Sequence, residues 1–171
     1  MSTVGVISLG CSKNRVDSER ILGCFADAGF VITANPEKAE VLLVNTCGFI
    51  TPAKEESINT TLEMAQYKEH GGCKLLVMTG CLSQRYRAEL EEEMPEVDLF
   101  WGVHEPELLV RCVCTMLGLP ADCAMRGRRI LTTPAYSAYL RIADGCDNRC
   151  TYCAIPLIRG GRKSVPMEAL L

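Results

Sequence analysis

The most concentrated chemistry in this sequence lies in the stretch GCDNRCTYC, where Cys146, Cys150 and Cys153 have the spacing C-x3-C-x2-C. We call these three residues the loop cysteines. The spacing lets one loop present three thiolates to one iron–sulfur cluster, whose usual ligand is cysteine. Three ligands in place of four leave one iron open to bind and activate another molecule. Zinc is the alternative, but it would need a fourth ligand from elsewhere in the chain.

A second set of cysteines follows three apolar runs. VGVISLGC ends at Cys11, VLLVNTC at Cys47 and KLLVMTGC at Cys81, and we call these residues the strand-end cysteines. One such cysteine would most often be a small buried apolar residue. Their repetition at three matching places favours a site for zinc or for an iron–sulfur cluster, because both bind thiolates. Buried cysteines at three strand-to-helix turns are the alternative interpretation.

Polar residues flank the strand-end cysteines, and the sequence contains five further cysteines. Asn14, Asn45 and Thr46 could orient ligands through hydrogen bonds, although ordinary turn chemistry explains them equally well. His70 and His104 lack the spacing of ligands and are expected at the surface. We assign no metal to the cysteines in helices or loops without a matching context, which are Cys24, Cys73, Cys112, Cys114 and Cys123.

The elements that must position the strand-end cysteines alternate between short β-rich runs and helix-length segments over the first 120 residues. This alternation predicts a parallel sheet with crossover helices. Strands are expected at 4–9, 31–33, 41–45, 75–79 and 97–102. In a flavodoxin-like order 2-1-3-4-5, strands one, three and four are neighbours about 4.8 Å apart and end at one edge. The strand-end cysteines should therefore converge there.

Helices are expected between these strands. The first should begin near Asp17 as N-cap and stop at Gly29, and the second, over 51–72, should carry Pro52 in its first turn and close at Gly71–Gly72. Two more are expected at 83–94 and 105–117, followed by loss of periodicity from residue 118. A new strand is expected within 138–146, and a helix near Pro166.

Composition describes an ordinary globular chain with many cysteines. The 171 residues are 48% hydrophobic and 23% charged, enough for one domain and the start of another. No apolar run approaches the roughly 20 residues that span a bilayer, and no basic segment precedes the first strand. We therefore expect no membrane span or secretory signal, and a cytoplasmic protein. Eleven cysteines cannot all pair, so a disulfide framework is not favoured.

The net charge of −3 conceals a change of sign along the chain. Residues 1–125 hold 10 Lys and Arg against 18 Asp and Glu, whereas residues 126–163 hold 8 against 2. We therefore expect one domain over 1–125, a linker over 126–135 and a second, incomplete domain over 136–171. The basic second part fits an anionic partner such as RNA, and a solvated basic surface is the alternative.

CDNRCTYC after a strand resembles the signature of the radical S-adenosylmethionine (SAM) superfamily, in which the open iron binds SAM. Together with LGCSKNRVDSE, NTCGFITPAKEES and TGCLSQRY, it makes the chain similar to the methylthiotransferase family of these enzymes. The resemblance covers essentially the whole chain. It implies a flavodoxin-like or Rossmann-like sheet followed by the first part of a radical SAM (βα) barrel.

The resemblance also implies the cofactors and the reaction. Two 4Fe-4S clusters are implied, one on the loop cysteines and an auxiliary one on the strand-end cysteines. Tyr152 matches the superfamily's aromatic residue against the adenine of SAM, with a core or surface tyrosine as the alternative. Sulfur would come from the auxiliary cluster, the methyl group from one SAM, and a hydrogen-abstracting radical from another. An electron donor such as flavodoxin or ferredoxin is the implied partner.

The same motifs indicate a substrate. GCSKNRVDSE resembles the GC-x-KN-x-VDSE of the branch that modifies the β-carbon of an aspartate in the twelfth small-subunit ribosomal protein, and CLSQRYRAELEEEMPEVD is similar to that branch too. The branch that modifies tRNA adenosine, typically GCQMN, is the first alternative; a zinc-binding structural or RNA-interaction module is the second. The family's remaining barrel units and C-terminal domain are missing beyond Leu171, so this chain resembles an N-terminal fragment expected to lack turnover.

Overall fold

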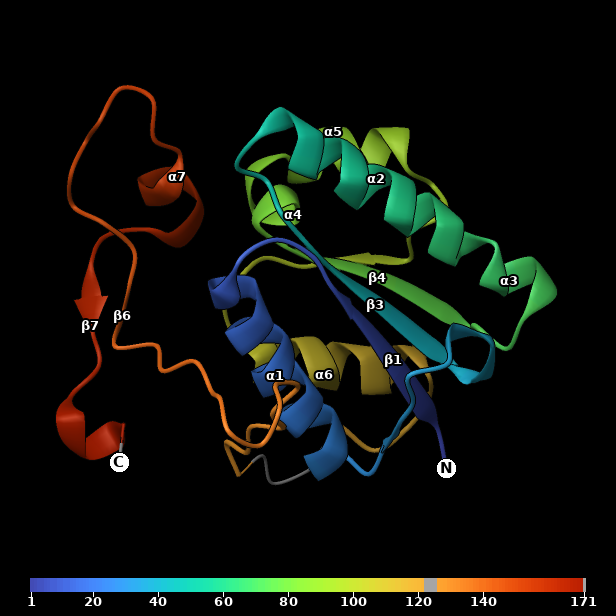
Figure 1. The fold of residues 1–171 in the computed structure, drawn as a ribbon. Coiled ribbons are helices and arrows are strands. Elements are labelled where there is room, and N and C mark those ends of the chain that lie inside the picture. The colour runs from blue at the N-terminus through green and yellow to red at the C-terminus, as the bar shows by residue number, and fades with distance from the viewer. Residues whose placement is uncertain (122–125, 171) are drawn as a thin grey trace.

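The computed structural model describes residues 1–121 and 126–170 and contains a five-stranded parallel sheet (Figure 1). The strand order is β2-β1-β3-β4-β5, the order predicted for a flavodoxin-like fold. The strands are β1 (Thr3–Ser8), β2 (Val31–Ile32), β3 (Val41–Thr46), β4 (Leu75–Gly80) and β5 (Leu99–Phe100). The predicted α/β class and strand order are thus confirmed for this part of the chain.

The three central strands end at the same level because of their register. Ser8 of β1 pairs with Asn45 of β3, and Asn45 pairs with Thr79 of β4. All six residues of β3 and of β4 are buried, as expected for strands covered on both faces. The aligned ends place the residues that follow each strand along one edge of the sheet.

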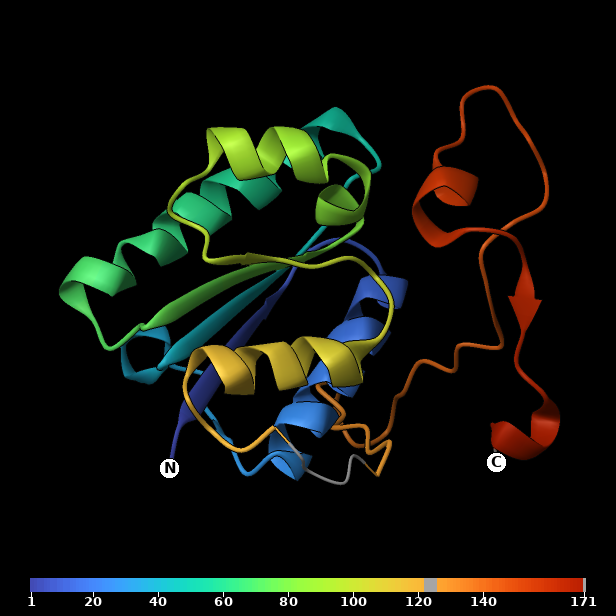
Figure 2. The ribbon, with the colours of Figure 1, turned by 180° about the vertical axis from the view of Figure 1, so that it is seen from behind.

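Helices cover both faces of the sheet (Figures 1 and 2). On one face Leu43 and Val77 pack with Phe25 and Leu109, and on the other Leu42 packs among a second set of apolar side chains. The first face carries α1 (Ser12–Asp27) and α6 (Pro106–Met116). The second face carries α2 (Thr51–Ala65), α3 (Tyr67–His70), α4 (Cys81–Arg85) and α5 (Arg87–Glu93), and the short 3-10 helix η1 (Pro36–Lys38) precedes β3.

The first helix begins earlier than the sequence predicted. Its N-cap is Cys11, so the predicted N-cap at Asp17 is wrong. The chain enters the helix directly after the short turn at Gly10, and Asp17 lies inside the helix, where its carboxylate pairs with Arg141 and Arg159. The predicted stop is confirmed, since Gly29 follows the helix with φ +84.

Two other predicted helices are each divided into two. The second helix breaks at Gln66 between α2 and α3, and the helix predicted at 83–94 breaks at Tyr86 between α4 and α5. Tyr86 has φ −126 and ψ 33, which is outside helical geometry. The break lets α4 follow directly from β4 while α5 packs Leu90 into the second face of the core.

Residues 126–132 lie against α1. The amide of Ile130 donates to the carbonyl oxygen of Glu19 at 3.0 Å, and a Cβ on Gly23 would lie 1.9 Å from the carbonyl oxygen of Arg128. Glycine at position 23 therefore permits the close approach of the two backbones. Much of the predicted linker 126–135 is thus attached to the first domain. Cys123 lies outside the described residues.

The remaining residues form a small second part beside the carboxyl edge of the sheet (Figures 1 and 2). The strand predicted within 138–146 is limited to β6 (Ala143–Asp144), which pairs antiparallel with β7 (Lys163–Ser164). Helix α7 (Ile155–Arg159) lies between them, and the 3-10 helix η2 (Met167–Ala169) follows Pro166. The described residues thus do not test the predicted barrel.

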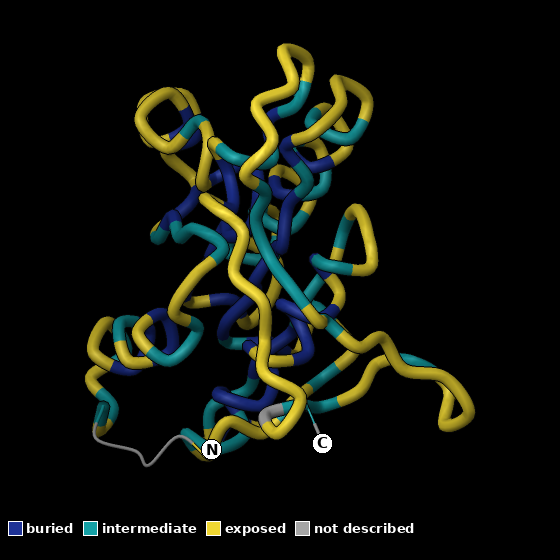
Figure 3. Tube along the Cα trace, turned by 90° about the vertical axis from the view of Figure 1, so that its left-hand side faces the viewer, coloured by how far each residue is buried: buried dark blue, intermediate teal, exposed yellow. Residues whose placement is uncertain are grey.

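Burial is concentrated in the parallel sheet and its flanking helices (Figure 3). Most residues between 131 and 153 are exposed. Within the described ranges, every helix is too short or too polar to cross a membrane.

Candidate functional site

The strand-end cysteines meet at the carboxyl edge of the sheet. The Oδ1 atom of Asn14 lies 3.7 Å from the sulfur of Cys11 and 3.6 Å from the sulfur of Cys81. The sulfur of Cys47 would lie 3.3 Å from a Cβ on Gly10, next to the same turn. The structure therefore brings together three thiols from three separate turns.

A close contact between β3 and β4 brings Cys81 to this place. Gly80, the residue before Cys81, has φ +102, and a Cβ there would lie 2.4 Å from Oδ1 of Asn45. Glycine at position 80 meets both requirements, since it accepts positive φ and has no side chain to collide. The chain can thus turn from β4 into α4 directly beside the end of β3.

Buried polar side chains hold this edge together. Asn14 donates to the carbonyl oxygen of Thr46 at 2.9 Å, and Asn45 donates to the carbonyl oxygen of Asn14 at 2.8 Å. Thr46 donates from Oγ1 to the carbonyl oxygen of Thr79 at 2.6 Å. All three side chains are buried, so each bond satisfies groups that water does not reach. The bonds fix the backbone that carries Cys11 and Cys47.

Arg159 is a member of the site that the sequence analysis missed. Its side chain is 1% exposed and donates to Asp17 at 2.7 Å and to Asp144 at 3.1 Å. The same guanidinium donates to Oδ1 of Asn14 at 3.3 Å and to the sulfur of Cys81 at 3.7 Å. The sequence offered only a basic segment as a signal, because nothing local distinguishes a buried arginine from its solvated neighbours.

The charges of the two parts partly neutralise each other. Of the eight basic residues in 126–163, four form ion pairs with described acidic groups, namely Arg128, Arg129, Arg141 and Arg159. Arg129 pairs with the buried carboxylate of Glu19 at 2.6 Å. The basic segment predicted to favour an anionic partner thus serves in part as the internal partner of α1.

Electrostatics around Cys81 combine opposing effects. Burial raises the pKa of the Cys81 thiol, and the Arg159 guanidinium opposes this by favouring the thiolate. Burial also acts to raise the pKa of Asp144, but the charge of Arg159, the hydrogen bond from the Gly145 amide and the charges of Arg141 and Lys13 together outweigh it and lower that pKa below its ordinary value. Arg159 consequently stabilises negative charge both at the carboxylate and at the sulfur.

The loop cysteines lie between β6 and α7. The amide of Cys146 donates to the carbonyl oxygen of Gly160 at 3.1 Å, which closes the base of the loop. Within the loop, the amide of Cys153 donates to the carbonyl oxygen of Cys150 at 3.1 Å. Cys150 is exposed, and Cys146 and Cys153 are half-buried. Tyr152 is 86% exposed, so its predicted packing against the adenine of SAM stays a prediction.

Helix α7, which follows the loop cysteines, contacts one of the strand-end cysteines. Ala154, which follows the last loop cysteine, and Ile158 pack directly with Cys81 in a small buried apolar cluster. This contact connects the two cysteine sets through one short helix.

The donors available fit iron–sulfur ligation by type. Each set offers three thiols, and such clusters are held by cysteine thiolates bound to different iron atoms. Among residues 1–121 and 126–170, no three His, Cys, Asp or Glu side chains are placed to hold a single metal ion. His104 and the side chain of His70 are exposed, as predicted. Metal binding by either set stays a prediction.

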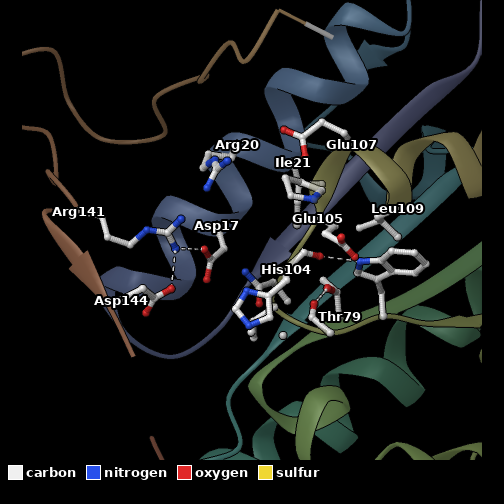
Figure 4. Close-up of a pocket in the computed structure, with 16 residues that line it drawn as sticks. Asp17, Arg20, Ile21, Thr79, His104, Glu105, Glu107, Leu109, Arg141 and Asp144 are labelled. Carbon is white, nitrogen blue, oxygen red and sulfur yellow. Dashed lines mark hydrogen bonds and ion pairs between the residues drawn. The ribbon is translucent and has the colours of Figure 1, made fainter. Parts of the chain in front are cut away.

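A cavity of about 230 Å³ lies at the same edge of the sheet (Figure 4). Asn45 and Gly80 line it from the sheet, and Arg141 lines it from the second part. Figure 4 shows Arg141 joined to Asp17 and Asp144 at its border. Both parts of the chain therefore contribute charged groups to the cavity, which apolar side chains such as Ile21 and Trp101 also line.

A family model described as "Uncharacterized protein family UPF0004" matches residues 3–102, more than half of the chain. The chain belongs to this family. The UPF0004 match contains all five strands of the parallel sheet and the three strand-end cysteines. It ends before the loop cysteines.

Individual relatives extend the similarity across the loop cysteines. The chain is 47% identical over 188 residues to the "Ribosomal protein uS12 methylthiotransferase RimO" of Desulforamulus reducens. It is 49% identical to proteins of the same name from Clostridium botulinum (strain Langeland), over 177 residues, and Heliobacterium modesticaldum, over 179 residues. The alignments cover 98 to 99% of this UPF0004 chain and 38 to 40% of the relatives. The chain thus spans about 40% of the length of the curated relatives it matches.

Proposed function

We propose that the complete protein is a cytoplasmic radical SAM methylthiotransferase that adds a methylthio group to the β-carbon of an aspartate in ribosomal protein uS12. The observation that carries this proposal is the 47 to 49% identity, across both cysteine sets, to proteins named as uS12 methylthiotransferases. The convergence of the strand-end cysteines, two of them on Asn14 and the third beside Gly10, supports it independently. Residues 1–125 would form the auxiliary-cluster domain, 126–135 the connection and 136–171 the beginning of the radical SAM barrel.

Two 4Fe-4S clusters and SAM are the proposed cofactors. The strand-end cysteines would hold the auxiliary cluster and the loop cysteines the SAM-binding cluster, with Tyr152 facing the adenine. When bound, these groups would supply the transferred sulfur and the one-electron cleavage of SAM, with flavodoxin or ferredoxin as electron donor.

The residues of this chain would bind, orient and shield these groups. Asn14 and Thr46 hold the turns that carry two of the strand-end cysteines, and α7 sets the loop beside the third. Cys81 is only 8% exposed, so part of the auxiliary site is shielded from water. Radical chemistry needs such exclusion, because water and stray donors would divert a reactive intermediate.

Anaerobic reconstitution of the complete protein with iron and sulfide tests the cofactor assignment. Two 4Fe-4S clusters predict about eight irons per chain and a brown protein with broad visible absorbance. A variant with all three loop cysteines changed to Ala should keep about half of that iron. A colourless protein with stoichiometric zinc would instead support the zinc-binding module and overturn the proposal.

Mass spectrometry of cells that lack the complete gene tests the substrate. The uS12 aspartate should lose its methylthio group, and the gene should restore it. Modified tRNA adenosine from the same cells is the control and should be unchanged. Loss of the tRNA modification with uS12 still modified would favour the tRNA branch and contradict the ribosomal assignment.

A further inference from the structure

Helix α7 covers Cys81. Ala154 and Ile158 pack against this cysteine in an apolar cluster to which Val103 also contributes, and Cys81, Ala154 and Ile158 are each 8% exposed or less. The helix directly follows the loop cysteines, so it connects the two cysteine sets. An apolar contact of this size sets no orientation by itself, because it is not directional.

The orientation of α7 is set by Arg159, the last residue of the helix. Its guanidinium is fixed by two carboxylates, one from α1 (Asp17) and one from β6 (Asp144). The Nη2 atom that donates to Asp17 also lies 3.7 Å from the Cys81 sulfur and 3.3 Å from the Asn14 amide oxygen, so its second N–H is shared between these two acceptors. An arginine held by two carboxylates has little rotational freedom, so its N–H groups are pre-oriented toward the sulfur.

We propose that Arg159 is a positioning residue that fixes α7 over the strand-end site and donates an N–H···S hydrogen bond to a cluster ligand, Cys81. This inference rests on the proposed function, since it assumes that a cluster binds there. Hydrogen bonds to cluster sulfurs and nearby positive charge stabilise the more reduced, more negative state of a cluster. Arg159 therefore makes the auxiliary cluster easier to reduce.

Reduction potential gives a readout that a purely structural role would not move. In the complete protein, changing the three loop cysteines to Ala leaves the auxiliary cluster as the only expected one, and EPR-monitored redox titration then measures its midpoint. In that background Arg159→Met should shift the midpoint to a more negative value. Arg159→Lys, which keeps the charge but loses the forked geometry, should recover part of the shift. Arg162→Met, at an exposed arginine of the same segment, should leave the midpoint unchanged.

An unshifted midpoint in Arg159→Met with the cluster retained would overturn the inference and leave the proposed function intact. Absence of any cluster in the background variant with Arg159 unchanged would instead overturn the auxiliary-site assignment itself. The background variant, measured first, therefore distinguishes failure of the auxiliary-site assignment from failure of the inference about Arg159.

Hydrogen exchange tests the positioning without a cluster. In the metal-free complete protein, Arg159→Met should speed exchange of the Ile158 and Gly160 amides, which are bonded within α7, by about tenfold or more. Tenfold corresponds to about 1.4 kcal/mol, close to the lower end of what one hydrogen bond to a charged group contributes. Exchange unchanged from that of the Arg162→Met control would show that Arg159 does not hold α7 in place.

Discussion

Asn14 donates a hydrogen bond of 2.9 Å to the carbonyl oxygen of Thr46, the residue before Cys47. The bond joins the first turn of α1 to the end of β3, two elements that carry different strand-end cysteines. Because the Asn14 oxygen also contacts the sulfurs of Cys11 and Cys81, one side chain touches the surroundings of all three thiols. This arrangement makes Asn14 the most informative residue for testing the geometry of the site.

Asn14→Ala should destabilise the parallel-sheet domain by about 1–3 kcal/mol, because it leaves the buried Thr46 carbonyl and other polar groups without their partner. Denaturation of the metal-free complete protein in guanidinium chloride measures the change. Asn59→Ala, at an exposed position of α2, is the matched control and should stay within about 0.5 kcal/mol of the unchanged protein. Equal effects of the two substitutions would contradict the role of Asn14.

Cys47→Ala should remove about half of the iron from the reconstituted complete protein, because the two clusters draw on separate cysteine sets. Iron and sulfide analysis measures the loss. Cys112→Ala in α6 is the control and should keep the full iron content, since that cysteine belongs to neither set. Loss of all iron in Cys47→Ala would argue against two separate sites.

Gly80→Ala should destabilise the fold more than Gly118→Ala does. Both glycines have positive φ, at +102 and +67, so both substitutions carry backbone strain of order 1 kcal/mol. The added Cβ at Gly80 also meets Asn45 at 2.4 Å, whereas none of the described atoms lies within 4 Å of a Cβ at Gly118. The midpoints of guanidinium chloride denaturation of the two variants isolate this steric effect when they are compared. Similar midpoints would refute the tight contact of β3 with β4.

The attachment of residues 126–132 to α1 should weaken in acid. Burial acts to raise the pKa of Glu19, but hydrogen bonds from Thr132 and Arg129 outweigh it and lower the pKa below its ordinary value. A carboxyl with a lowered folded-state pKa contributes stability that is complete above its unfolded value of about 4.3 and is lost as pH falls through the folded value.

Glu19→Gln should remove this part of the pH dependence and lower stability at pH 7, as measured by denaturation across pH 3–7. Glu92→Gln, at an exposed glutamate of α5, should retain the pH dependence of the unchanged protein. If Glu19→Gln and the unchanged protein have parallel profiles, the buried carboxylate does not hold the segment.

The sequence by itself determined the five-stranded sheet and the place of the strand-end cysteines. Continuous apolar runs such as 41–44 predict strands covered on both faces, and parallel strands necessarily end at one edge. The loop cysteines were equally readable, because their spacing is a local property of the chain. Helix boundaries were harder to predict. Aspartate is a residue type that favours the N-cap, but Asp17 is an interior residue of α1.

Only the tertiary structure decided which charged groups are buried together. Arg159 and Asp17 are separated by 142 positions, and four arginines of the basic segment pair with carboxylates that the sequence does not identify as their partners. A hydrogen bond depends on distances and angles that exist only after folding, so arginines alike in sequence become different in space. For that reason the two sets of cysteines could be predicted from the chain, whereas the cation that contacts a sulfur could not.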